Sequence, residues 1–517
     1  MANTEIELKF LLDEATEKRL RRAGSVGDIG AGPASTTTLV TIYYDTAERA
    51  LQRAGIALRL RRKGRRWVQT VKAGRLLRAG LSEATELDCP APGGRLALDA
   101  IPDAGIRKDV KERVNGHALS PVFRTEMRRT ARRLTVPDLG EVELAIDAGQ
   151  VVAGDRTAPL HEAELELLSG KPHAVFEAAR ALFPKGGMRF SNLTKAERGA
   201  LLADHGVIDL PLKPRTAKPV AVSKAMTTEA AGREILGECL DQIQANLAVV
   251  MASDDPEGPH QLRIGLRRLR TALTLLRPAM GCPGFKILNA EARWLGREVG
   301  RLRDLDVAGA ELVAAEAERS NDPGFALLTA AMEQATLAER ADLRALLAEG
   351  RGQRLVLDLA QCVTTRGWLA PQDYDQTDRL ARPIQETAAK ALNAALKRAA
   401  RRARGIGTLS IPARHDLRKA LKKLRYTTEF AAPLFPAKKA RPFLKRLKAL
   451  QTVFGDLNDA AMAEALLCGP AAPAGGDPEA MRAAGRVIGG LSARADLAWD
   501  GAKSRWRTFS ETAPFWH

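Results

Sequence analysis

Acidic and basic residues alternate with apolar ones near the start of the chain, over Glu5-Ile6-Glu7-Leu8-Lys9. Successive side chains of a strand point to opposite faces, so Glu5, Glu7 and Lys9 would share one face. Carboxylate oxygens are the ligands that hard divalent cations prefer, and an ammonium group binds phosphate. The segment is therefore a candidate site for a metal ion and a phosphate together. The other interpretation is a solvated strand face.

Several β-rich runs later in the first 200 residues repeat this alternation, with cations and anions on different runs. The in-phase cations are Arg59, Arg61 and Lys72, and the in-phase acids are Glu141, Glu143, Glu162, Glu164 and Glu166. Many short strands separated by turn residues indicate an antiparallel sheet or barrel. We expect a closed barrel with a charged lumen and an apolar outside covered by helices, because buried charge needs a reason. Salt-bridged pairs across an open sheet are the alternative.

Motifs across residues 1–206 resemble, in order, those of the CYTH, or triphosphate tunnel metalloenzyme, family. They are Glu5-x-Glu7-x-Lys9, Tyr43-Tyr44-Asp45-Thr46, the run from Gly55 to Arg61, Gln69-Thr70-Val71-Lys72, the alternating glutamates 162–166, and Asn192-Leu193-Thr194-Lys195-Ala196-Glu197-Arg198-Gly199. The resemblance implies an eight-stranded antiparallel tunnel that binds a triphosphate group with Mg²⁺ or Mn²⁺. Members of the family include inorganic triphosphatases, thiamine triphosphatases and class IV adenylate cyclases.

The resemblance also implies roles for individual residues, with Glu5, Glu7 and Lys9 at the catalytic centre. The implied metal ligands are Glu5 and Glu7, with partners among Glu162, Glu164 and Glu166 and assistance from Asp147. The implied phosphate ligands are Lys9, Arg59, Arg61, Lys72, Lys195 and either Arg128 or Arg129. These residue types suit phosphoryl transfer, which needs charge neutralisation and alignment more than covalent chemistry. The sequence offers no Ser-His-Asp or Cys-His set for a covalent intermediate.

The second half of the chain differs in composition from the first. Residues 207–223 contain three prolines and no amphipathic period, which predicts an extended linker. From residue 224 onward Ala, Leu, Arg and Glu dominate, and apolar residues recur at helical spacing. The segment that begins at His260 matches the segment that begins at His415, and at the same offset Asp304 matches Asp459. These matches predict a duplicated helical unit.

Each copy of the repeat carries a histidine and three cations on one helical stripe, beside a stripe of leucines. The stripes are His260, Arg263, Arg267 and Arg270 in the first copy, and His415, Arg418, Lys422 and Arg425 in the second. A charge-balanced solvated face would carry acids four residues from the cations. No acidic residue occurs between 260 and 280 or between 417 and 428, so we expect anion binding.

Residues 224–505 resemble the CHAD family of conserved-histidine α-helical domains. That resemblance implies two pseudo-symmetric four-helix bundles and the binding of inorganic polyphosphate in a basic groove. The repeat is imperfect, because Thr452 and Asp456 stand where the first copy has Arg297 and Arg301. The predicted architecture is therefore α+β: a tunnel domain over residues 1–206, a linker over 207–223 and an all-α domain over 224–505.

The overall composition agrees with a polyanion partner. The chain has 80 Lys and Arg against 62 Asp and Glu, a formal charge of +18. Such a field attracts nucleic acid, anionic lipid or polyphosphate. Aromatic residues make up only 4% of the chain, which argues against single-stranded nucleic acid. The five scattered cysteines predict free thiols and no zinc site. With no signal pattern and no apolar run of membrane-spanning length, we expect a cytoplasmic protein, in part associated with polyphosphate granules.

Three functions fit these features. The first is metal-dependent hydrolysis of inorganic triphosphate, with polyphosphate held by the helical half. The second keeps the tunnel and changes the substrate, as in an adenylate cyclase or a thiamine triphosphatase; Tyr43, Tyr44 and Trp67 are the aromatic candidates for an organic ring. The third is a granule-binding protein with little catalysis, against which the intact Glu5, Glu7 and Lys9 argue.

Overall fold

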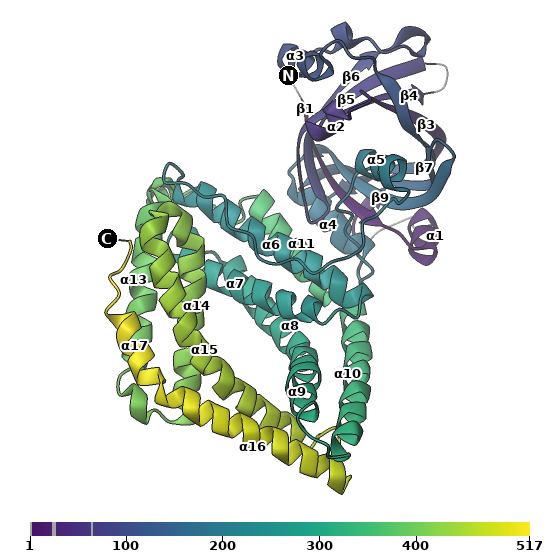
Figure 1. Ribbon diagram of the computed structural model, residues 1–517. Helices are drawn as coiled ribbons and strands as arrows, with labels where there is room; N and C mark the ends of the chain where they lie inside the picture. The colour runs from purple at the N-terminus through teal and green to yellow at the C-terminus, as the bar shows by residue number, and fades with distance from the viewer. Residues whose placement is uncertain (1–2, 23–26, 64–65, 517) are drawn as a thin grey trace. The chain divides into compact units, whose positions relative to one another are not determined.

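The computed structural model describes residues 3–22, 27–63 and 66–516. The chain forms two compact units, which are described separately below (Figure 1). The first unit comprises Met1–Leu212 together with Ala348–Thr365. The second comprises Lys213–Leu347 and Arg366–His517.

Eight antiparallel strands of the first unit close into a barrel. They are β1 (Asn3–Leu11), β3 (Ser35–Asp45), β4 (Ala57–Lys63), β5 (Arg66–Arg78), β6 (Leu81–Pro90), β7 (Ser120–Val136), β8 (Gly140–Ala153) and β9 (Arg156–Gly170). Their order is β3-β4-β5-β6-β1-β9-β8-β7, and β7 pairs back with β3 to close the ring. The two-residue strand β2 (Gly30–Ala31) also pairs with β7. The prediction of an eight-stranded antiparallel tunnel is thus confirmed.

The two faces of β1 show why the barrel has a charged inside and an apolar outside. Leu8 and Phe10 are completely buried, and the Phe10 ring lies 4.9 Å from that of Phe183 on the outer side. Glu7 and Lys9, in the opposite phase, line the lumen. The outer side is covered by α1 (Glu14–Arg22) and α4 (His173–Leu182), which contact β8 and β9. In contrast, α5 (Lys195–His205) packs on Phe123 and Met127, which share the strand phase of the lumen residues.

Two helices complete the surroundings of the barrel. α2 (Ala50–Arg53) and α3 (Ala104–Val114) form an apolar cluster with strands β4 and β5, with Leu51 and Val110 fully buried. α11 (Arg351–Thr364), although far along the chain, belongs to the first unit and packs on α4. The Arg180 guanidinium of α4 donates to the Asp358 carboxylate of α11 at 2.5 Å.

The second unit contains two sets of four long helices in the same order (Figure 1). The first set is α6 (Thr228–Ala252), α7 (Glu257–Met280), α8 (Pro283–Val307) and α10 (Gly324–Ala348). The second is α13 (Ile384–Arg402), α14 (Ile411–Ala431), α15 (Ala437–Leu467) and α16 (Pro478–Asp500). Three shorter helices are α9 (Ala314–Ala317), α12 (Tyr374–Ala381) and α17 (Ala502–Ser510). The described part of this unit has no strand, so its predicted all-α class is confirmed.

The two sets pack against each other. α6 contacts α13 and α7 contacts α14, while α8, α10, α15 and α16 share a second apolar cluster that includes Phe325 and Val487. The predicted leucine stripes lie in these interfaces: Leu262 and Leu269 of α7 and Leu417 and Leu424 of α14 are completely buried. The helical period of the sequence therefore predicted the packing faces correctly.

Two simpler expectations can be compared with the structure. All five cysteines are free thiols, as predicted. Among the described residues, no helix has both the length and the apolar character needed to cross a membrane.

Candidate functional site

Charged side chains from almost every strand of the barrel surround a cavity of about 610 Å³. The sequence-predicted residues that line it are Glu5, Glu7, Lys9, Arg59, Arg61, Lys72, Arg129, Glu164, Glu166 and Lys195. Asp147 and Glu162 lie directly beside it, where both contact Lys195. The structure thus brings together residues that are spread over nearly the whole first domain.

Lys9 lies between two carboxylates. Its Nζ is 2.9 Å from Glu7 and 2.5 Å from Glu164, and all three side chains are nearly inaccessible to solvent. Burial alone would lower the pKa of Lys9, but the charges of Glu164 and Glu7 outweigh it and raise that pKa well above its usual value. Lys9 is therefore a permanent cation at the base of the cavity.

Lys195 and Arg129 form a second network around Asp147. The Lys195 Nζ lies 2.8 Å from Asp147 and 3.0 Å from Glu164. The Arg129 guanidinium donates to both Asp147 oxygens, at 2.8 and 2.7 Å, and to Glu164 at 2.7 Å. Arg128 points the other way and is exposed, so the structure places Arg129 in the lumen and Arg128 outside it.

The first turn of α5 fixes the position of Lys195. Thr194 is the N-cap: its hydroxyl accepts from the Glu197 backbone N–H, and the Glu197 carboxylate accepts from the Thr194 backbone N–H. This reciprocal pair is a capping box, which ends the preceding segment and starts the helix at Lys195. The Thr-Lys-Ala-Glu sequence therefore serves to aim one ammonium group into the barrel.

The sequence did not predict Glu86 as a site residue, and it offered Tyr43 only as a candidate contact for an organic ring, yet both line the lumen. Glu86 accepts from Arg59 at 2.8 Å and lies 2.6 Å from the Lys72 ammonium. Burial would raise the pKa of Glu86, but Arg59 and Lys72 bring it down to about 2. Tyr43 lies close to Arg59 and helps to raise the pKa of that guanidinium. The only sequence signal for Glu86 was its phase with Asp88 on β6, and Glu83 of the opposite phase obscured it.

The remaining carboxylates are less well balanced by cations. Burial, followed by the charge of Glu7, raises the pKa of Glu5 to about 8 and that of Glu166 to about 7. Glu7 and Glu166 are register partners of β1 and β9. Glu5 also lies 2.5 Å from the Lys72 ammonium. The charge of Glu7 acts on both of the other carboxylates, and an all-oxygen donor set of this kind suits Mg²⁺ or Mn²⁺. This group of residues therefore fits a divalent metal.

A second acidic cluster also has suitable donors. Asp147, Glu162 and Glu164 each offer a carboxylate oxygen, and these oxygens lie within 4.8 Å of one another. The Glu162 Oε2 atom is buried and accepts no hydrogen bond. Lys195 and Arg129, however, already neutralise this cluster, since Lys195 contacts all three carboxylates. Among the described residues, these three carboxylates lie close enough together to share an ion, and the two cations beside them oppose its binding.

In the second unit the two predicted cationic stripes face each other. Burial, together with the nearby charges of Arg267, Arg418 and Arg263, lowers the pKa of Lys422 to about 6. Burial and Arg267 likewise lower the pKa of Arg418 to about 10. Since Arg263 and Arg267 belong to α7 and the others to α14, cations from both copies of the repeat lie close to one another where α7 contacts α14. We call these four residues the groove cations.

Some of the predicted cations do have acidic partners. The Arg263 guanidinium donates to the Asp304 carboxylate at 2.7 Å, and Arg425 donates to Glu429 at 2.8 Å. The inference that the stripe lacks acidic partners is therefore wrong for these two residues. Asp304 comes from α8, and Glu429 lies one residue beyond the acid-free run 417–428. The matched pair Asp304 and Asp459 thus acts through the arginines: Asp459 lies near Arg418.

The other members of the stripes are more peripheral. Burial and neighbouring cations lower the pKa of both His260 and His415, with Arg303 the main cation beside His260 and Lys419 beside His415. His260 is half-buried and His415 is exposed. Arg270 donates to the Asn289 side chain at 3.1 Å. The lowered pKa values favour the neutral form of both imidazoles.

Comparison with known proteins places these two units in families. A CYTH domain model matches residues 3–200, and a CHAD domain model matches residues 234–468. A curated relative from Haemophilus influenzae, named inorganic triphosphatase, is 28% identical over 161 residues, which cover 31% of this chain and 44% of the relative. The chain thus spans less than half the length of that relative.

Solved structures resemble each part of the chain. The crystal structure of the CHAD domain from the plant Ricinus communis is 31% identical and covers 57% of this chain and 96% of its own, with a TM-score of 0.46. A Hippeastrum protein, described as having a dominant triphosphatase activity, is 18% identical and covers 40% of this chain and 99% of its own, with a TM-score of 0.30. The family matches and the architecture agree: the chain carries a CYTH domain followed by a CHAD domain.

Proposed function

We propose that the barrel domain hydrolyses inorganic triphosphate with Mg²⁺ or Mn²⁺. The observation that carries this proposal is the convergence of cations and carboxylates on one cavity of about 610 Å³. The lining cations are Lys9, Arg59, Arg61, Lys72, Arg129 and Lys195. A triphosphate is a compact polyanion, and this arrangement neutralises it on several sides at once. The similarity to a protein named inorganic triphosphatase supports the same choice.

The lumen residues divide the work of phosphoryl transfer between them. Glu5, Glu7 and Glu166 would hold the metal, which supplies charge neutralisation and an oriented, acidified water. As a triphosphate enters, its oxygens replace carboxylates as partners of cations such as Lys72 and Arg59. Water then bonds to the terminal phosphorus while the bond to the leaving diphosphate breaks, and the cations stabilise the charge on that diphosphate. No described lining residue is a histidine or cysteine that could form a covalent intermediate.

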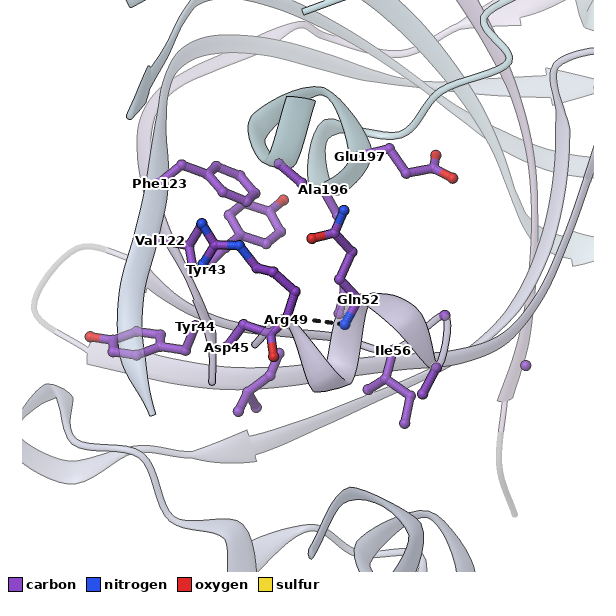
Figure 2. Close-up of a pocket in the computed structure, with 16 residues that line it drawn as sticks. Tyr43, Tyr44, Asp45, Arg49, Gln52, Ile56, Val122, Phe123, Ala196 and Glu197 are labelled. Carbon is purple, nitrogen blue, oxygen red and sulfur yellow. Dashed lines mark hydrogen bonds between the residues drawn. The ribbon is translucent and has the colours of Figure 1, made fainter. Parts of the chain in front are cut away.

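A second candidate substrate class has an observation in its favour. A hollow of about 300 Å³ adjoins the cavity and shares Tyr43, Gly55 and Ala57 with it. The Tyr43 and Phe123 rings stack at 4.4 Å on one side of this hollow, and Gln52 reaches across it toward Ala196 (Figure 2). Such a wall suits the ring of an organic triphosphate, as in a thiamine triphosphatase or an adenylate cyclase.

One assay separates these substrates. Phosphate release from tripolyphosphate, ATP and thiamine triphosphate is measured side by side, with cyclic AMP monitored. We expect tripolyphosphate to give the highest kcat/KM, because all of its charge can be placed among the lumen cations. A higher kcat/KM for ATP or thiamine triphosphate would show that this organic substrate, and not tripolyphosphate, is the preferred one.

The metal assignment is tested by Glu7→Ala. We expect phosphate release from tripolyphosphate to fall below detection, while the circular dichroism spectrum and melting temperature stay close to those of the wild type. Glu126→Ala is the matched control: Glu126 is on β7, and its carboxylate pairs with Arg124 away from the cavity lining. Unchanged release in Glu7→Ala would refute the assignment.

We further propose that the helical domain binds inorganic polyphosphate along the groove cations, and that this binding localises the enzyme to polyphosphate granules. Cations that repel each other, as the lowered pKa of Lys422 indicates, are stabilised by a polyanion. The test is titration with long-chain polyphosphate and, in parallel, with duplex DNA. Tighter binding of the DNA would point to a nucleic-acid partner instead.

A further inference from the structure

A separate hollow of about 360 Å³ lies among α7, α12, α13 and α14 of the helical domain. Much of its wall is apolar, formed by Leu275, Pro278, Ala279, Ala391, Ala394 and Ala395. Six cations also line it: Arg277, Arg379, Arg382, Lys390, Arg398 and Lys423. No acidic residue is among the described lining residues. Its size is within the range of small-molecule sites in proteins.

Only part of this positive charge is neutralised. Arg379 pairs with Asp373 at 3.2 Å, and Arg382 pairs with Asp378 at 2.5 Å. For the other four lining cations, no carboxylate of the described residues forms an ion pair. These four, Arg277, Lys390, Arg398 and Lys423, are called the hollow cations below. Unbalanced like charges around one concavity favour the binding of an anion.

Lys423 is the innermost of the hollow cations. It is half-buried, whereas Arg277 and Arg398 are exposed. Burial, then the charges of Arg398, Arg277 and Arg270, lower the pKa of Lys423 to about 8. Every charged neighbour that shifts Lys423 is therefore a cation, and the ammonium group has no compensation from the protein.

The internal repeat shows that this lack of compensation is particular to one side of the domain. Arg268 of α7 occupies the position equivalent to Lys423 in the first copy. Its guanidinium is buried over the Phe430 ring at 4.8 Å, and it lies 3.5 Å from the Glu429 carboxylate. The same repeat position is thus balanced by an acid in one copy and left open to a hollow in the other.

The hollow is also distinct from the groove. Lys422, the preceding residue, lies among Arg267, Arg418, Arg263 and Arg425. Lys423 lies among Arg398, Arg277 and Arg270, none of which is a groove cation. Every unit of a polyphosphate chain carries a hydrated charge. A largely apolar wall would remove that water without offering hydrogen bonds in its place, which costs free energy. An anion with a charged end and an apolar body matches such a wall better.

We propose that this hollow binds a compact organic phosphate of about mononucleotide size, with its phosphate held by Lys423, Arg398 and Arg277 and its ring against Leu275, Pro278 and Ala391. Charge-assisted contacts would position the phosphate, and burial of the ring would add affinity that inorganic phosphate cannot obtain. The proposal goes beyond polyphosphate binding and does not depend on it.

The test uses the full chain and adenosine 5′-monophosphate as the probe, in metal-free buffer, by isothermal titration calorimetry. Lys423→Gln should weaken the probe about tenfold, the effect of losing one charge-assisted hydrogen bond. Lys422→Gln is the matched control and should change that affinity less than about twofold while weakening long-chain polyphosphate. Any binding of the probe in the barrel contributes equally to the measurements on both variants, since both substitutions lie in the helical domain.

A second variant keeps the test decisive if Lys423→Gln folds poorly. Ala394 lies on the wall and is exposed, so Ala394→Glu should be tolerated and should place a carboxylate in the hollow. It should abolish binding of the probe and leave both polyphosphate binding and tripolyphosphate hydrolysis unchanged. Equal affinity for the probe in wild type and in Lys423→Gln would overturn the proposal. So would inorganic phosphate binding as tightly as the nucleotide.

Discussion

At the scale of single residues, strand phase decides which charged side chains can share a site. Arg128 and Arg129 are chemically identical neighbours, yet only Arg129 reaches Asp147 and Glu164 in the lumen. The sequence predicted most lumen residues because their alternation with apolar residues was regular. It did not predict Glu86, because β6 has acidic residues in both strand phases. The alternation therefore does not show which face of β6 points into the lumen.

Arg129 and Arg128 therefore form a matched pair for mutation. We expect Arg129→Ala to lower kcat/KM for tripolyphosphate at least about 100-fold, because it removes a guanidinium that can bind phosphate in two places. It also leaves Asp147 and Glu164 repelling the substrate. Arg128→Ala should stay within about twofold of wild type, since its side chain is exposed outside the lumen. Steady-state kinetics measure both, and equal losses would contradict the placement.

At the scale of elements, the helical period predicted which face of each helix is buried, but not how the two copies meet. The leucines of α7 and α14 are in the core as expected. Nothing in either copy's spacing states that Arg267 and Lys422 face each other, because that relation depends on how α7 packs against α14. The pairing of Arg263 with Asp304 likewise joins residues of different helices, beyond the reach of any local pattern.

The closeness of cations from α7 and α14 predicts that the proposed binding of polyphosphate depends on pH. Lys422 has its pKa lowered to about 6 by burial and by four arginines, and a bound polyanion would raise it toward the ordinary 10.5. Binding then takes up a proton between these two pH values. Affinity should therefore be highest below pH 6 and fall as the pH rises, at most about tenfold per unit. Titrations at pH 6, 7 and 8 measure this slope.

The control for this dependence is Lys422→Met, which should bind more weakly at pH 6 and lose much of the slope between pH 7 and 8. An unchanged slope would assign the proton to another group. The free energy of unfolding depends on pH in the opposite direction from the binding affinity. Between pH 6 and 10.5, Lys422 of the unfolded chain is protonated to a greater extent than Lys422 of the folded chain. Without a ligand, this group therefore makes the folded state more stable as the pH rises through that range.

At the scale of the whole molecule, the order of a β-barrel domain and a helical domain follows from the change of composition near residue 224. The assignment of α11 does not. The predicted all-α domain over residues 224–505 includes α11, yet α11 is grouped with the barrel unit and contacts α4 there. The pattern of an amphipathic helix predicts that one face is buried but does not identify the element that covers it. Only the structure shows that element.

The net charge of +18 belongs to the whole chain and attracts any polyanion. The dependence of affinity on salt concentration distinguishes this general attraction from contacts made by single residues. Affinity for long-chain polyphosphate should fall steeply with salt, because each phosphate-bound cation releases counterions. Replacing Arg418 with Gln should reduce the slope of log K against log salt by about one.

The double variant His260→Ala with His415→Ala should weaken binding with the slope unchanged at pH 7.5, because both imidazoles have a lowered pKa and are neutral there. A reduced slope in the double variant would mean that the histidines bind as cations, and an unchanged affinity would remove them from the site.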